Sequence, residues 1–209
     1  IPYHITGGTA FLDRGEVKDV LAWLRVIANP DDDAAFLRAV TSPKREVGST
    51  SLEKLAQLAH NAHVPLSLAA QNSSYMSALS ARPAAGLAEF SRLVVKLRGQ
   101  SKSGKAADIV RAVINESGIL AQLRLETKNE ALFLRRKENL DELAQWFESE
   151  RRPSGAGDLA AQLALLSNAD RGEPGNAVRL MSLHAAKGLE FRAVFVIGCE
   201  DGNLPHEAS

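Results

Sequence analysis

The chain has 209 residues, of which 45% are hydrophobic, and its 25 basic side chains balance its 25 acidic ones. This composition supports a folded core and excludes a disordered chain, and no apolar run approaches the ~18 residues that span a bilayer. A single cysteine, Cys199, excludes an internal disulfide and fits a reducing cytoplasm. Zero net charge gives no global reason to expect nucleic-acid binding. Because Ile1 is not Met and no signal peptide follows, we expect a piece of a larger protein.

The first 29 residues predict a strand followed by a helix. A short β-like run over residues 3–5 precedes the turn signal Gly7-Gly8, and Asp13 is placed to cap the helix that comes next. Asn29-Pro30 should end this helix, because proline lacks the backbone N–H that would continue it. Apolar residues at helical spacing predict its buried face: Val17, Val20, Leu21, Leu24, Ile27 and Ala28.

Nearly all of the sequence from Asp31 to about Ala169 has the apolar spacing of helices. Asp31-Asp32-Asp33 places negative charge at one helix start, and Thr50 with Glu53 predicts another. The longest helix is expected over residues 128–151. Turns are expected at Gly86, Gly104, Gly118 and residues 153–155. Three helices are predicted to bury apolar stripes, which are Leu87, Phe90, Leu93, Val94 and Leu97; Ile109, Val110, Val113 and Ile114; and Leu132, Leu140, Leu143, Trp146 and Phe147.

After a linker at residues 170–175 the pattern changes. Residues 178–183 and 194–197 are short, bounded apolar runs typical of buried parallel strands, and a polar loop at residues 184–190 separates them. Strand-like ends around an all-helical middle indicate a helical domain inserted into one α/β domain.

Two weaker patterns are set aside. Residues 99–106, GQSKSGKA, are similar to a phosphate-binding P-loop, but a helix precedes them and Ala106 lacks the hydroxyl that would hold Mg²⁺. We interpret this segment as a basic connection between helices. His60 and His63 could present two imidazoles to a metal, yet no acidic or thiol partner accompanies them nearby in sequence, so no metal site is expected.

The most informative segment runs from Val178 to His206. Ligands of parallel α/β domains bind at the carboxyl ends of strands, which makes candidates of Ser182, His184, Lys187 and Glu190. A tight turn with solvated charges explains these residues equally well. The run VRLMSLHAAKGLEFRAVFVIGCEDGNLPH resembles motif V of superfamily 1A DNA helicases, the UvrD, PcrA and Rep group, whose pattern is LMTxHxxKGLEFxxVFxxGxExGxxPH.

A second block resembles the same family. Residues 7–25 resemble the family pattern GGxxFFxRxEVKDxLAYLR, with Leu12 in place of the second Phe and Trp23 in place of Tyr, and residues 29–33, NPDDD, extend the resemblance. Residues 41–48, TSPKREVG, are closest to the Rep branch, which has TPKREIG where relatives have TPxRGIG. The resemblance is strong at both ends of the chain and loose between about Ala59 and Ala177.

The resemblance implies a fold and a division into domains. These helicases have two RecA-like motor domains, and the second, called 2A, is interrupted by a helical insertion called 2B. The implied chain is mainly α. It has a partial 2A segment at residues 1–29, a helical-bundle 2B-like insertion at 30–175, and a partial α/β 2A segment carrying motif V at 176–209.

The resemblance also implies roles for single residues. The parent would be an ATP- and Mg²⁺-dependent 3′–5′ DNA helicase whose Walker motifs lie outside this chain, so the chain alone should bind no nucleotide and hydrolyse no ATP. Glu190 is implied at the nucleotide ribose, and Ser182 and His184 at single-stranded DNA. Thr9 and Arg14 are further candidates for single-strand contact, for which a helix cap and a surface arginine are equally good explanations.

Lys44, Arg45, Gly48 and Thr50 are candidate contacts to the backbone of duplex DNA. The basic residues supply charge, the glycine permits close approach, and a helix starting near Thr50 would offer free amides and a positive dipole end. This arrangement resembles the helix–hairpin–helix grip on a duplex. An ordinary turn, made by Gly48 and capped by Thr50, is the alternative.

The expected partners are single-stranded and duplex DNA, with replication or repair proteins besides. We expect a monomeric chain in the bacterial cytoplasm, at the nucleoid and not at a membrane. The preferred interpretation is part of a Rep-type helicase of replication or replication restart. The alternatives are a UvrD-type repair helicase and a non-catalytic regulatory or protein-docking helical module, which the balanced charge and helical middle permit.

Overall fold

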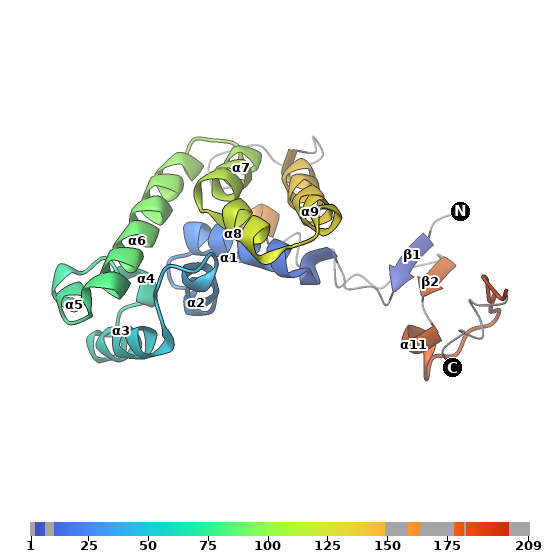
Figure 1. Cartoon of the computed structure of the whole chain (residues 1–209), viewed down its shortest axis with the longest axis horizontal. Coiled ribbons are helices and arrows are strands. Elements are labelled where there is room, and N and C mark those ends of the chain that lie inside the picture. Colours follow the sequence, from blue (N-terminus) through green and yellow to red (C-terminus); the bar gives the residue numbers. More distant parts are fainter. Residues whose placement is uncertain (1–2, 7–10, 149–158, 164–177, 182, 201–209) are drawn as a thin grey trace. The chain divides into compact units, whose positions relative to one another are not determined.

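The computed structural model describes residues 3–6, 11–148, 159–163, 178–181 and 183–200, and it divides the chain into two units (Figure 1). The smaller unit comprises Ile1–Gly8 and Pro174–Ser209, and the helical unit comprises Thr9–Glu173. In sequence, the helical unit therefore lies between the two parts of the smaller one.

The smaller unit is built on two parallel strands, β1 (Tyr3–Thr6) and β2 (Val178–Met181). Their register pairs Tyr3 with Val178 and Thr6 with Met181. Parallel strands require a long crossover connection, and here that connection contains the whole helical unit. The two strand-like ends of the sequence thus pair with each other.

The segment after β2 differs from its prediction. A short helix, α11 (Leu183–Ala186), occupies the first part of the expected polar loop. Residues 194–197 form no strand, and Phe195 and Ile197 are 89% and 85% exposed. A buried parallel strand needs neighbours on its edges and faces, and within the described residues the sheet contains only β1 and β2.

The helical unit begins with a short 3-10 helix, η1, and continues with α-helices. Their bounds are Phe11–Asp13 (η1), Gly15–Ala28 (α1), Asp33–Thr41 (α2), Ser49–Ala62 (α3), Leu66–Ala69 (α4), Ser73–Ser77 (α5), Ala81–Ser101 (α6), Ala106–Glu116 (α7), Ile119–Glu126 (α8) and Glu130–Glu148 (α9). Residues 159–163 are also helical.

The core of this unit is organised around α1, which contacts α2, α6, α7, α8 and α9. Trp23 on α1 packs edge-on against Phe90 on α6, with 4.7 Å between ring centroids, and Phe90 meets Phe36 on α2 at 5.4 Å. Each fully buried ring of this size contributes roughly 1.5–3 kcal/mol. The three rings therefore fix α2 and α6 against α1.

The apolar stripes predicted for α6 and α7 are confirmed. The buried members are Leu87, Phe90, Val94, Leu97, Ile109, Val110, Val113 and Ile114. On α9, Leu140 and Leu143 are buried as predicted, whereas Leu132 is 44% exposed. On α1, Trp23 and Val26 are buried in addition to the predicted face, because helices pack on several sides of α1.

Several helix starts and turns are corrected. Asp32 caps α2 by accepting from the amide of Ala35 at 2.9 Å, within the predicted acidic run. Asp13 does not cap α1 and instead pairs with Lys18 at 2.6 Å. Thr50 is not a cap either, since α3 begins one residue before it. Gly86 lies inside α6 rather than in a turn.

The unit boundary also differs from the expected one. We expected residues 1–29 to belong with the C-terminal segment, but the compact units divide between Gly8 and Thr9. The physical reason is the burial of α1, which supplies the centre of the helical core. The assignment of these units to 2A and 2B stays a prediction.

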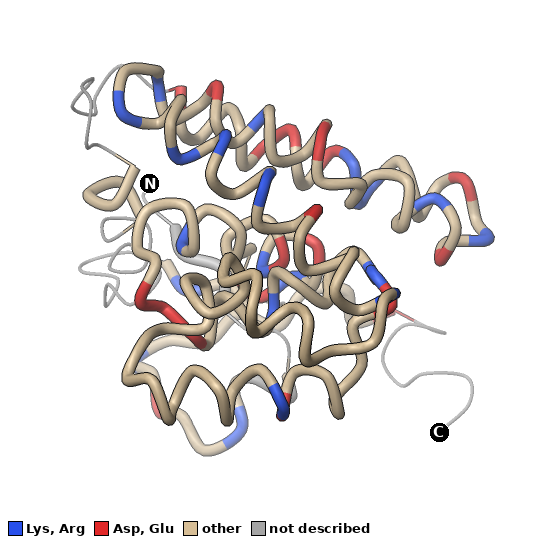
Figure 2. Tube along the Cα trace, turned by 90° about the vertical axis from the view of Figure 1, so that its left-hand side faces the viewer, with Lys and Arg blue, Asp and Glu red and all other residues tan. Residues whose placement is uncertain are grey.

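Charged residues of both signs are interspersed along the helices, as Figure 2 shows. In the part of the chain that the structure describes, no helix combines the length and the apolar character needed to cross a membrane.

Candidate nucleic-acid interface

The candidate duplex contacts lie in the α2–α3 loop, residues 42–48, and in the first turn of α3. The Ser42–Pro43 peptide bond is cis. Pro43 and Val47 are buried, while Lys44 is exposed. The backbone N–H of Lys44 donates to Oε1 of Gln122 on α8 at 2.5 Å. The loop is thus packed against the helical unit and leaves the side chain of Lys44 accessible.

Arg45 is turned into the protein. Its Nη1 donates to the carbonyl oxygens of Ala39 and Val40, both at 3.4 Å, and of Pro43 at 2.7 Å. Its Nη2 donates to the carbonyl of Ser117 at 2.8 Å. These bonds argue against the predicted phosphate contact, because both terminal nitrogens already donate to the backbone. The assignment of Arg45 as a DNA contact is thus disfavoured, and it stays a prediction.

The guanidinium of Arg45 also lies against aromatic rings. Its carbon is 4.8 Å from the ring centroid of Trp23 and 5.6 Å from that of Phe90. Burial lowers the pKa of Arg45 to about 10, although the negative charge of Glu89 acts to raise it. The side chain is still cationic at neutral pH, so carbonyl dipoles and ring faces hold a partly buried charge.

The first turn of α3 is open. Gly48 is its N-cap residue, with φ −86° and ψ 171°, and a Cβ built there would meet nothing within 4 Å. Any residue adopts this extended backbone, so the turn itself does not require glycine. No side chain caps α3, and Thr50 is exposed. Because the first amides of a helix lack intrahelical partners, this turn offers donors to a ligand.

The sequence prediction missed Gly86 as part of this region. A Cβ added to Gly86 would lie closer than 3.0 Å to the backbone oxygen of Arg45 and 3.1 Å from Cγ2 of Val47. The missing side chain lets the α2–α3 loop approach α6. A glycine within a strong helical pattern was the available signal, since it often marks close packing.

Arg14, a candidate single-strand contact, is tied to α9. Its Nη1 donates to Oδ1 of Asn139, and its guanidinium carbon lies 5.2 Å from the ring centroid of Phe11. Asn139 in turn donates to Oε1 of Glu16 at 2.6 Å, and Glu16 is only 6% exposed. Arg14 thus belongs to a polar network of the helical unit, and Thr9 lies outside the described residues.

The motif V-like segment is only partly described. Glu190 is exposed, and His184 lies in α11, although its side chain is outside the described part. Ser182 lies outside the described residues as well. The structure therefore leaves Glu190 accessible and does not test the other two assignments.

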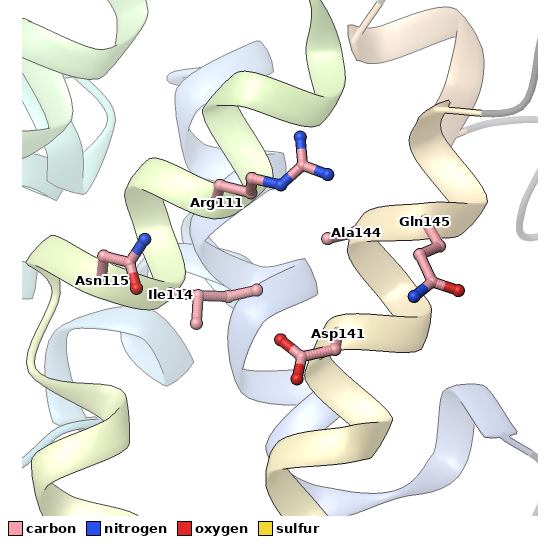
Figure 3. A pocket seen from close by; sticks show the side chains of 6 residues that line it. All are labelled: Arg111, Ile114, Asn115, Asp141, Ala144 and Gln145. Atoms are coloured by element: carbon pink, nitrogen blue, oxygen red, sulfur yellow. The ribbon is translucent and has the colours of Figure 1, made fainter.

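An open polar cleft of about 300 Å³ lies between α7 and α9 (Figure 3). Its lining residues are Arg111, Ile114, Asn115, Asp141, Ala144 and Gln145. Arg111 pairs with Glu148 at 2.6 Å, and this hydrogen bond raises the pKa of Arg111. Among the described residues, no group of three or more His, Cys, Asp or Glu side chains is arranged to hold a metal. We assign the cleft no functional role.

The family model of the UvrD-like helicase C-terminal domain matches residues 1–209. The ATP-dependent DNA helicase PcrA of Bacillus subtilis is 37% identical over 99% of this chain. The ATP-dependent DNA helicase Rep and DNA helicase II of Escherichia coli are 34% and 35% identical, each over 100% of the chain. The chain spans 29%, 32% and 30% of the lengths of these three relatives. It belongs to the UvrD-like helicase C-terminal domain family and is similar to superfamily 1A DNA helicases of the UvrD, PcrA and Rep group.

Proposed function

We propose that this chain is part of an ATP-dependent DNA helicase and that its helical unit grips duplex DNA through the α2–α3 loop and the first turn of α3. Support for the first part comes from the relatives, whose names describe ATP-dependent DNA helicases and which align along 99% and 100% of the chain. The proposed grip on duplex DNA rests on Lys44, because this residue is an exposed cation on a loop that is bonded to the rest of the helical unit.

The grip is electrostatic and independent of base sequence. Lys44 supplies a charge for a phosphate, and the uncapped amides at the start of α3 supply hydrogen-bond donors with a positive dipole end. Gly48 keeps this turn open to a close approach, since no side chain covers it. Contacts of this kind position a protein on the duplex without reading bases.

We further propose the roles that the family resemblance implies for the rest of the chain. Residues 30–175 correspond to 2B, and residues 1–29 and 176–209 correspond to parts of 2A, in a 3′–5′ helicase of the bacterial cytoplasm. Glu190 contacts the ribose of the ATP that the parent binds with Mg²⁺, and Ser182 and His184 contact single-stranded DNA. The run from Arg45 to Gly48 favours the Rep branch over the UvrD branch. The chain alone hydrolyses no ATP.

The test is duplex binding by the 209-residue chain, measured by fluorescence anisotropy between 50 and 200 mM salt. Lys44→Ala should weaken binding to unrelated duplex sequences equally, by about eightfold at 0.1 M salt, and should flatten the salt slope by about one unit, as expected for one lost phosphate contact.

The control is Lys102→Ala, which removes the same charge from an exposed position in the α6–α7 connection. It should keep the affinity and salt slope of the unchanged chain. Equal behaviour of the two variants would contradict a site at Lys44. Absence of any duplex binding would favour the protein-docking alternative.

A further inference from the structure

Arg45 joins three parts of the helical unit through backbone carbonyls. Ala39 and Val40 lie in the last turn of α2, Pro43 lies in the loop itself, and Ser117 is the C-cap residue of α7. The last carbonyls of a helix have no intrahelical partners, and a cation at a helix C-terminus is favoured by the dipole. Arg45 therefore occupies a place where two helix ends converge and where its charge is stabilised from both.

The aromatic ring that lies against Arg45 places a second constraint on the position of the loop. Trp23, whose ring faces the guanidinium, donates from Nε1 to the carbonyl of Ser42 at 2.9 Å. The same ring thus contacts the loop at its first residue and at Arg45. Only a planar, forked cation can donate to several carbonyls while stacking on a ring face, which lysine cannot do.

Gly86 supplies the third constraint, from α6. The backbone of Arg45 approaches this helix so closely that there is no room for a Cβ at Gly86. Neither Arg45 nor Gly86 presents a group to solvent as Lys44 does: Arg45 donates inward and Gly86 is buried. Both residues instead determine where the backbone of the loop lies.

We propose that Arg45 is a positioning residue for duplex binding, and that Gly86 allows the backbone of the α2–α3 loop to pack against α6. This inference rests on the proposed function. The guanidinium holds residues 42–48 against α2, α6 and α7, so that Lys44 and the first turn of α3 are presented together to one duplex backbone. Arg45 itself touches no phosphate. A displaced loop should therefore abolish the contribution of Lys44 to duplex binding, even when every exposed charge remains.

The test uses two variants of the 209-residue chain in the salt-dependent duplex assay. Arg45→Lys keeps the charge but loses the fork, and Gly86→Ala changes no charge and displaces the loop. Each should weaken binding by about eightfold at 0.1 M salt and flatten the salt slope by about one unit, as loss of one phosphate contact does. Adding Lys44→Ala to either variant should cause little further loss, because the contact is already gone.

Two controls separate positioning from general stability, with folding checked by circular dichroism at the assay temperature. Gly99→Ala places the same methyl group on α6 where nothing lies within 4 Å. Leu140→Ala opens a cavity at a fully buried residue of α9, a helix that shares none of the hydrogen bonds described above for the loop. Both should keep the salt slope of the unchanged chain. An equal loss in Leu140→Ala would show that any destabilisation impairs binding and would overturn the inference.

The outcomes distinguish this inference from the proposed function. If Lys44→Ala weakens binding while Arg45→Lys and Gly86→Ala bind like the unchanged chain, positioning is wrong and the duplex site stands. If Arg45→Lys alone retains affinity, Arg45 acts through its charge, and positioning is again wrong. If Lys44→Ala has no effect, the duplex site itself is wrong, and the inference falls with it.

Discussion

The close approach of the α2–α3 loop to α6 makes a quantitative prediction about stability. In an exposed helix interior, replacing glycine by alanine stabilises by roughly 0.5–1 kcal/mol, because alanine loses less backbone entropy on folding. Gly86→Ala should do the opposite. Its methyl group would lie closer than 3.0 Å to the backbone oxygen of Arg45, which is part of a loop held by four hydrogen bonds from one guanidinium.

Relief of that clash requires movement of a backbone rather than rotation of a side chain. Overpacking of this kind costs about 1–3 kcal/mol, which outweighs the gain in helix propensity. We expect Gly86→Ala to lower the free energy of unfolding by about 1–2 kcal/mol, which lies within the range that the difference between these two effects allows. For a unit of this size the midpoint of thermal unfolding should fall by about 2–4 °C for each kcal/mol.

Urea unfolding followed by circular dichroism at the helix band measures the effect. Gly99→Ala is the matched variant, since it lies in the same helix and its new methyl group meets nothing within 4 Å. It should be neutral or should stabilise the chain by up to about 1 kcal/mol. If both variants shift the urea midpoint alike, Gly86 has no special packing role, and the seating of the loop on α6 is refuted.

Two further predictions concern neighbouring features. Glu46 has φ 58°, where a non-glycine residue is strained. Glu46→Gly should therefore raise the free energy of unfolding by roughly 0.5–1 kcal/mol, measured by thermal unfolding, while Glu46→Ala should not. Asn139→Ala removes the 2.6 Å hydrogen bond to the buried carboxylate of Glu16. It should lower the free energy of unfolding, measured in urea, by about 1.5–3 kcal/mol. Lys137→Ala, which breaks only an exposed pair on the same helix, should change stability by less than about 0.5 kcal/mol.

Periodicity predicted the helices well because burial of one face is a local property. The stripes of α6 and α7 recur every three or four residues, and both helices bury them against α1. Helix ends were predicted less well. Asp13 and Thr50 are suitable capping types, yet neighbouring residues begin α1 and α3, because cap identity alone does not determine where a helix starts.

The direction of Arg45 could not be read from its neighbours in sequence. The run from Lys44 to Gly48 has the charge and glycine content of a phosphate-binding turn, and Lys44 remains exposed as that interpretation requires. Arg45 is drawn inward by the ring of Trp23 and by the carbonyl of Ser117, which lies 72 residues away in the chain. Local patterns predict which residues can bind DNA, but only tertiary contacts decide which of them reach solvent.

Contacts between residues far apart in the sequence also place the boundary between the compact units before α1. The sequence block at residues 7–25 looks continuous, but its first two residues and its helix belong to different compact units. Glu16 receives its hydrogen bond from Asn139, 123 residues later, and Trp23 lies at the aromatic centre shared with α2 and α6. A division after Asn29 would remove from the helical unit a helix that α2, α6, α7, α8 and α9 all contact. The buried residues of α1 are thus part of the core of the helical unit.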